Sequence, residues 1–455
     1  MNEPKKTRAS EALKAYARRC VDTLALVDPP VIPELSGRWV RVSAEAFEFQ
    51  QTAEPLWEIS FLQHRDELWN FPEHAIAITA LRDDEDISSH LDVLVGTPMS
   101  ATRTDAEEFP DQLVQRMARR LGRMAYDDAM FDALFAEFEA EIARKASPHV
   151  LMVPLMGFEA ADTPIVLGRR LEIDRLTDDE IARCLGAGYL RSFFRTATTQ
   201  FDLKEAYGVR ATFELPKIFG EDRPLSAEAV APQTEAVSRA SGVGEALRIF
   251  KAGDVVVPGY LVFSPTAPQG GQLRTAGSQN VPSDRYVLTA GEGREFEDFW
   301  SRYERAKRNP AIASAARRFG YAFERRRLDD RLVDLVISAE SLLLSDQSQR
   351  TELRYRFSLR AAFYTEGSDL TKREVYAQMK KAYDARSAIV HGGGDPPAKL
   401  LTNPAGEPLS FQAFVESVEA LIRLTLRKTI SDYRGAKHIA DWEGLIIPSS
   451  AEPLG

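Results

Sequence analysis

The stretch YDARSAIVHGGGDPP, from Tyr383 to Pro397, decides how the C-terminal part of this chain is interpreted. It places Arg386 and His391 five residues apart near the end of a predicted helix, and three glycines follow at once. Five residues of a straight helix turn through about 140°, so the two side chains would not share a face if the helix continued unchanged. Because glycine tolerates the left-handed backbone that ends helices, the last turn can tighten or unwind and place His391 beside Arg386. A histidine at this position can also be a cap that the helix dipole favours.

The residues on both sides of this stretch predict a helical C-terminal domain. Beyond Glu295 the strand patterns vanish, and apolar residues recur every three to four positions. The predicted helices cover residues 296–326, 329–345, 350–366, 371–391 and 409–433.

Three charged side chains fall on the apolar faces of these predicted helices. They are Glu340, Arg360 and Arg386, each from a different helix. A lone buried ion costs several kcal/mol, so inward charges are expected to pair or to line a water-filled cleft. We therefore expect Glu340 to pair with Arg360 or Arg386. Such a pair either fixes how the helices pack or belongs to a functional site.

The first 295 residues predict a mixed α/β region, which gives the whole chain an α+β class. Helical patterns begin at Ser10, cover residues 106–145, and follow the capping box Thr177–Glu180. The expected strands are residues 75–81, 91–96, 150–158, 164–173, 209–215, 254–263 and 286–290. Residues 264–284 have the Pro, Gly and Ser content of a loop or hinge. We therefore predict two domains, residues 1–295 and 296–455.

The composition restricts the classes of function. The 455 residues carry a net charge of −10, which argues against bulk binding to nucleic acid or to an anionic membrane. Cys20 and Cys184 are too few for a disulfide framework or a zinc cluster. The charged N-terminus lacks the apolar segment of a signal peptide, and no run is long enough to span a membrane. We expect a cytoplasmic protein without a membrane, metal or cofactor requirement.

Three segments in order resemble the Apea-like branch of the HEPN superfamily. They are VDLVISAESLLL (333–344), YRFSLRAAFY (355–364) and YDARSAIVHG (383–392). The last matches the R-x(4 to 6)-H motif of HEPN ribonucleases, with the tyrosine and aspartate of the family ahead of the arginine and its glycine after the histidine. The resemblance covers roughly residues 310–432.

The resemblance implies a helical bundle that forms a homodimer, in which two such motifs face one another across a cleft. Many members cut RNA without a metal, and Apea-like members occur in bacterial defence against phage. The resemblance makes Arg386 and His391 the catalytic pair, with Asp384, Ser387, Glu340 and Arg360 in support. Active family members often carry asparagine, aspartate or histidine where this chain has Ser387.

RNA is the partner that this resemblance implies, and a basic segment precedes the motif helices. Residues 302–327 contain nine arginines and lysines against Glu304 and Glu324. Such a run is either a solvated helix face or a surface that follows phosphates. The candidate RNA contacts within it are Arg317, Arg318, Arg325, Arg326 and Arg327.

Two other functions stay open at this point. The first is a HEPN module that binds RNA or dimerises without cutting, which Ser387 and the acidic net charge favour. The second is an unrelated enzyme in residues 1–295, although no nucleophile, metal or phosphate motif is recognised there. If the nuclease interpretation holds, residues 1–295 would sense a trigger or hold the nuclease inactive.

Overall fold

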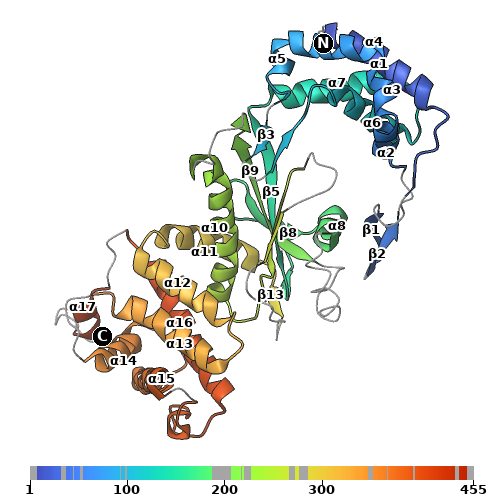
Figure 1. Cartoon of the computed structure of the whole chain (residues 1–455). Helices are drawn as coiled ribbons and strands as arrows, with labels where there is room; N and C mark the ends of the chain where they lie inside the picture. Colours follow the sequence, from blue (N-terminus) through green and yellow to red (C-terminus); the bar gives the residue numbers. More distant parts are fainter. Residues whose placement is uncertain are drawn as a thin grey trace. The chain divides into compact units, whose positions relative to one another are not determined.

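The chain forms an α+β protein (Figure 1), which confirms the predicted class. The computed structural model describes residues 8–31, 37–44, 46–51, 55–92, 94–97, 100–186, 206–216, 218–219, 227–265, 272–275, 285–346, 352–365, 367–392, 395–435 and 440–447. Two compact units make up the chain. Unit 1 contains residues 1–150, 212–236 and 263–270, and unit 2 contains residues 151–211, 237–262 and 271–455.

Unit 1 is built mainly from helices that share one apolar core. The helices are α1 (Arg8–Leu24), α2 (Trp57–Gln63), α3 (Arg65–Trp69), α4 (Pro72–Asp83), α5 (Glu85–Ser88), α6 (Phe109–Leu121) and α7 (Asp128–Ala143). Leu13, Tyr16 and Phe131 are fully buried among them. Within this core the carboxylate of Asp111 accepts hydrogen bonds from the hydroxyl of Tyr16 and, at 2.9 Å, from the indole of Trp69.

Short strands accompany these helices. The strands β1 (Gly37–Ser43) and β2 (Ala46–Gln51) form an antiparallel hairpin. A second small sheet has the order β10 (Ile218–Phe219), β3 (Leu94–Thr97) and β4 (Ser100–Arg103). The strand expected at residues 91–96 is therefore present in part as β3.

The strand predicted at residues 75–81 is wrong, because this segment lies in helix α4. Its alternating letters AIAITAL resemble a strand, but the buried residues are His74, Ala77, Ala80 and Leu81, which follow helical spacing. Ile76 is 59% exposed. Pro72 occupies the first turn, where its missing N–H is not needed. Small alanines, not isoleucines, therefore make the core contacts of this helix.

A six-stranded sheet contains most of the other predicted strands. Its order is β12 (Gln272–Thr275), β11 (Gly259–Phe263), β5 (Ala146–Leu155), β9 (Tyr207–Pro216), β8 (Leu171–Arg175) and β7 (Ile165–Val166). Beside it, β6 (Phe158–Ala160) pairs in parallel with β13 (Tyr286–Leu288). The predicted loop 264–284 contains β12, while its residues 266–271 and 276–284 lie outside the described part of the chain.

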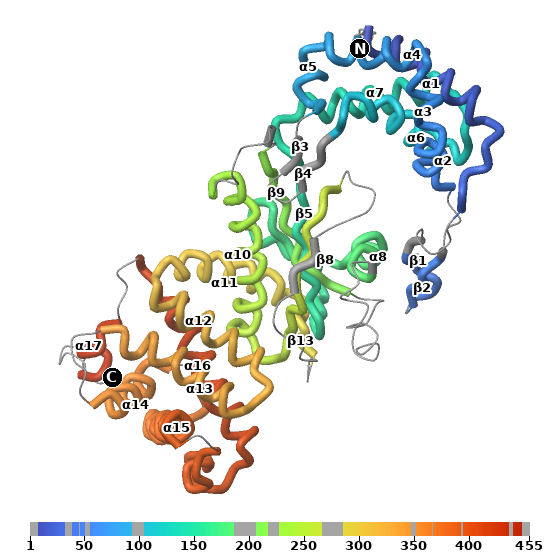
Figure 2. The backbone as a smooth tube through the Cα atoms, viewed as in Figure 1, coloured from blue at the N-terminus to red at the C-terminus, as the bar shows by residue number. Residues whose placement is uncertain are grey.

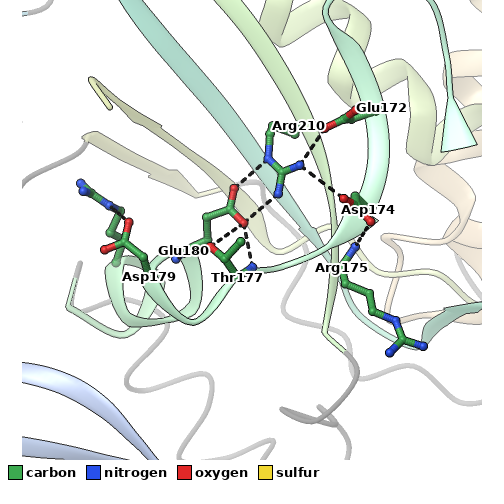
Figure 3. A network of polar contacts seen from close by, with 8 residues as sticks. Glu172, Asp174, Arg175, Thr177, Asp179, Glu180 and Arg210 are labelled. Atoms are coloured by element: carbon green, nitrogen blue, oxygen red, sulfur yellow. Dashed lines mark hydrogen bonds and ion pairs between the residues drawn. The ribbon is translucent and has the colours of Figure 1, made fainter. Parts of the chain in front are cut away.

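An ion-pair network fixes helix α8 (Asp178–Gly186) to the sheet (Figure 3). Arg210 on β9 donates to Glu172 at 2.7 Å and to both oxygens of Glu180 at 2.8 and 2.9 Å. The predicted capping box is confirmed, because the backbone N–H of Thr177 donates to Glu180 and that of Glu180 donates to the hydroxyl of Thr177. Burial alone would raise the pKa of Glu180, but the hydrogen bonds from Arg210 and Thr177 outweigh burial and lower the pKa.

The C-terminal part of unit 2 consists of helices, as predicted. They are α11 (Glu292–Ala306), α12 (Pro310–Ala322), α13 (Leu328–Leu343), α14 (Leu353–Tyr364), α15 (Lys372–Gly392), α16 (Phe411–Asp432) and α17 (Trp442–Ile446), with the short 3-10 helix η1 (Ala398–Leu400). The helix predicted at residues 296–326 is two helices. The first ends at Ala306, and Asn309 caps the second, since its side chain accepts from the N–H of Ala311 at 3.0 Å and Pro310 follows.

Helix α10 (Ala227–Phe250) was not predicted from the sequence. Pro232 lies inside this helix, and several glycines and serines interrupt its apolar pattern. Gly244 has a packing reason, because a Cβ atom on it would come within 2.9 Å of Val257. Helix α10 therefore needs a small residue where this neighbour approaches it closely.

Buried arginines join α10 to the helices that follow. Arg248 on α10 donates to the carbonyl of Val255 at 3.0 Å and to that of Gly320 on α12 at 3.0 Å. Arg423 on α16 donates to the carbonyl of Arg248 at 2.9 Å. These bonds explain why the compact units depart from the predicted division at residue 296. Residues 151–211 and 237–262 belong with the helices in unit 2.

Replacing Glu180 with glutamine should destabilise the protein near neutral pH by about 2 kcal/mol or more, because Arg210 loses a charged, largely buried partner. The lowered pKa of Glu180 sets the pH dependence. The stabilising contribution of Glu180 is present above the pKa that this group has in the unfolded chain. It is lost as pH falls through the lower pKa that the group has in the folded protein. Urea denaturation should therefore show a difference between wild type and Glu180→Gln that shrinks on acidification.

The matched control is Asp179→Asn in the same helix. Asp179 pairs with Arg183 at 2.7 Å, but its side chain is 70% exposed, so the change should cost less than about 0.5 kcal/mol. Equal losses in the two variants would contradict the structural role given to Arg210.

Candidate functional site

The predicted site residues come from helices α13, α14 and α15 of unit 2. Figure 2 shows α14 and α15 beside one another, and α13 packs against both. A capping box begins α15. The backbone N–H of Thr371 donates to Glu374 at 2.8 Å, and the N–H of Glu374 donates to the hydroxyl of Thr371 at 3.3 Å. This start fixes the phase of the helix, so Met379, Ala382 and Ala385 face the core.

Arg386 and Glu340 form the ion pair that helical phase predicts. Nη2 of Arg386 on α15 donates to Oε2 of Glu340 on α13 at 3.3 Å. The side chains are 24% and 20% exposed, so the pair lies at the edge of the helix interface. Burial raises the pKa of Glu340, and the positive charge of Arg386 offsets only part of that effect. Nε of Arg386 is buried and has no hydrogen-bond partner in the described part of the chain.

Arg360 pairs with Asp346, and not with Glu340 as considered from the sequence. Its guanidinium donates to both oxygens of Asp346 at 2.6 and 2.7 Å and to the carbonyl of Leu343 at 2.7 Å. The ring of Trp442 on α17 covers it, with 4.7 Å between the guanidinium carbon and the ring centroid. Arg360 therefore holds the end of α13 and does not contact Glu340 or Arg386. Asp346 and Trp442 were not predicted from the sequence.

Asp384 precedes Arg386 in the sequence of α15, and Ser387 follows it. The carboxylate of Asp384 accepts from Arg354 on α14 at 2.9 Å. Tyr383 packs on Phe357, with ring centroids 5.5 Å apart, and lines a cavity of about 570 Å³ together with Arg354 and Tyr355. Ser387 is half-buried and makes no hydrogen bond through its side chain to the described residues. Neither Asp384 nor Ser387 is among the residues that line this cavity.

His391 is exposed in the last turn of α15 and does not meet Arg386 within the chain. The helix continues without a break to Gly392, while Gly393 and Gly394 lie outside the described residues. The expected unwinding of the last turn is therefore not observed before Gly392. At about 100° and 1.5 Å per residue, His391 is rotated by about 140° and displaced by about 7.5 Å along the axis from Arg386. The imidazole has no hydrogen bond to any described residue.

Acidic residues neutralise much of the predicted RNA-binding segment. Arg318 and Arg325 both contact Asp334, at 2.9 and 2.6 Å, and Arg327 contacts Asp329 at 2.7 Å. Arg317 and Arg326 are exposed. Among the interleaved aromatic residues, Tyr303, Phe319 and Phe323 are buried, and Tyr321 is 39% exposed. Three of the five candidate RNA contacts, Arg318, Arg325 and Arg327, are therefore paired with acids of the chain.

No protein family model, curated protein or solved structure matches this chain. Within the described residues, no helix is long and apolar enough to cross a membrane. The same residues contain no group of three or more histidine, cysteine, aspartate or glutamate side chains that is arranged to hold a metal ion. The candidate site therefore rests on the contacts of α13, α14 and α15 alone.

The raised pKa of Glu340 predicts how this pair affects stability. A carboxyl group with a folded pKa above its unfolded value contributes stability below the unfolded pKa and loses it as pH rises through the folded pKa. Relative to Glu340→Gln, the wild-type protein should therefore become less stable as pH rises through this range. Thermal unfolding midpoints of both proteins across a pH series measure the difference.

Glu374→Gln provides a control on the same set of helices. Hydrogen bonds from Thr371 lower the pKa of Glu374, so the difference between wild type and this variant should change with pH in the opposite direction. If Glu340 followed the same direction as Glu374, the ion pair with Arg386 would outweigh burial and our assignment for Glu340 would be wrong.

Proposed function

We propose that the chain is a metal-independent endoribonuclease of the HEPN type, with Arg386 and His391 as its catalytic residues. The observation that carries the proposal is the position of Arg386. An ion pair with Glu340 through Nη2 holds its guanidinium at the edge of the helix interface, where the side chain stays 24% exposed. A fixed and partly exposed guanidinium suits a phosphate oxygen.

The proposed chemistry needs one cation and one group that moves protons. The 2′-hydroxyl of RNA loses its proton and attacks the adjacent phosphorus, and the bond to the 5′-oxygen breaks as that oxygen gains a proton. Arg386 would stabilise the charge that grows on the phosphate oxygens, and the imidazole of His391 would accept or donate the proton that moves. The products are a 2′,3′-cyclic phosphate and a 5′-hydroxyl.

A homodimer is part of the proposal, because one chain does not bring the two residues together. His391 and Val390 are exposed in the last turn of α15, and Val390 is 52% exposed. A second copy seated on this surface would place its own motif opposite the first and would cover the apolar side chain. We further propose a cytoplasmic protein that acts in bacterial stress or defence against phage, as the resemblance to Apea-like proteins implies.

The second candidate is a HEPN module that binds RNA or dimerises without cutting. The specific observation in its favour is the same ion pair, because Glu340 compensates the charge of Arg386 within the chain. Ser387, which differs from the residue usual in active family members, also favours it. Under this reading Arg386 would serve the packing of α13 and α15.

RNA cleavage by the full chain in excess EDTA separates the two candidates. We expect cutting that leaves 2′,3′-cyclic phosphate ends and that falls at least about 100-fold in His391→Ala and in Arg386→Ala, because each removes a group acting in the transition state. The matched control is Arg373→Ala, an exposed arginine in the first turn of α15, which should cut at the wild-type rate.

Three outcomes would decide against the proposal. Equal cutting by wild type and His391→Ala would place the activity elsewhere or in a contaminant. RNA binding without cutting would favour the second candidate. Cutting that requires a divalent metal would exclude the proposed mechanism.

A further inference from the structure

A second cluster of arginines lies in unit 2, between the ends of α11 and α16, which pack against one another. Arg302, Arg305 and Arg308 come from the last turns of α11 and the residues just after it, and Arg434 follows α16. Together with Ile430 and Tyr433, they line a cavity of about 800 Å³. We call this cavity the arginine cleft. No carboxylate is among its described lining residues.

The charges of the arginine cleft are not compensated within the described part of the chain. None of its four arginines forms an ion pair there, and all four are exposed. Three nearby acidic residues serve other cations: Glu304 contacts Arg239 at 2.7 Å, Glu245 contacts Lys307 at 3.2 Å, and Asp432 contacts Lys428 at 3.1 Å. The arginines of the cleft therefore differ from Arg318 and Arg325, whose charges are paired with the carboxylate of Asp334.

Helix ends account for only part of this clustering. Cations are favoured at helix C-termini, and two such ends meet here, each with a partial charge of about −0.5. Arg305 donates to the carbonyl of Ser301 at 3.3 Å, and Arg434 donates to those of Ser431 and Tyr433 at 3.1 and 3.2 Å. Four guanidinium groups still exceed the dipole charge by about three units. Most of their N–H donors make no hydrogen bond to a described residue and can meet a ligand.

We propose that the arginine cleft binds a nucleoside di- or triphosphate. The charge excess matches a polyphosphate, and planar guanidinium groups bind phosphate oxygens through two parallel hydrogen bonds. The cavity volume lies in the range of small-ligand sites, which is roughly 300 to 1,000 Å³. Tyr433 offers an aromatic wall for the base, and Ile430 offers a buried apolar floor.

A single nucleotide fits these observations better than an RNA strand. A surface that follows a strand presents its cations along a groove with a series of stacking residues. Here the cations gather around one hollow with one aromatic side chain. The proposal uses none of the residues assigned to RNA cleavage, so it stands or falls independently of the nuclease.

Isothermal titration of the full chain in EDTA, near physiological salt, tests the proposal with four probes. They are ATP, inorganic triphosphate, adenosine and a short 2′-O-methyl RNA, which lacks the free 2′-hydroxyl needed for cleavage. We expect ATP to bind more tightly than triphosphate, and adenosine to bind weakly. The double variant Arg302→Gln/Arg308→Gln should bind ATP at least about tenfold more weakly, because two charged hydrogen-bond donors are lost.

Arg294→Gln is the matched control, because Arg294 is exposed near the other end of the same helix and lies outside the cleft. It should bind ATP as the wild type does. The double variant should unfold at the wild-type temperature, since its arginines make no ion pair with described residues.

Several results would overturn the proposal. They are ATP affinity that is unchanged in the double variant, equal affinity for triphosphate and ATP, and RNA binding that is tighter than ATP binding and depends on Arg302 and Arg308. The last result would identify the cleft as an RNA surface. Loss of RNA cleavage in His391→Ala bears only on the nuclease and leaves the cleft unaffected.

Discussion

One buried guanidinium, that of Arg248, holds together the part of the chain that contains the candidate site. It donates to the carbonyls of Val255 and Gly320, and its own backbone carbonyl accepts from Arg423. Burial lowers the pKa of Arg248, which shows that its charge is expensive to keep away from water. Such a group persists only where its donors are satisfied. The segment that follows α10 therefore meets α10, α12 and α16 at a point where a neutral side chain would leave buried carbonyl groups without their donors.

The arginines of unit 2 fall into two groups, according to whether a carboxylate of the chain compensates their charge. Arg210, Arg318 and Arg360 each have carboxylates within hydrogen-bond distance and serve packing. The arginines of the cleft have none among the described residues. Counting basic residues along the sequence cannot distinguish these groups, because the acids that neutralise them come from other helices. The segment 302–327 looks uniform in the sequence, yet its first part lines a cavity and its second part is paired.

The sequence predicted those features that local rules determine. The capping box at Thr177, the approximate extents of helices α13 to α16 and the inward position of Glu340 and Arg386 follow from spacing and from cap residues. Local rules failed where tertiary contacts decide. In α4 the alternating isoleucines resemble a strand although the buried residues follow helical spacing, and in α10 Gly244 is explained by Val257, which lies outside the helix. Asp346 and Trp442 escaped prediction as partners of Arg360 for the same reason.

Trp442 covers Arg360 and also packs on Tyr364, with ring centroids 5.4 Å apart. Its indole thus touches α14 at two points, next to the ion pair that holds the end of α13. The chain has only five tryptophans, so the indole N–H signals in a nitrogen-15 NMR spectrum form a small set. The signal of Trp442 would be a natural spectroscopic reporter of this junction. Ligands or partner chains that displace α14 could be followed there without attaching any label to the protein.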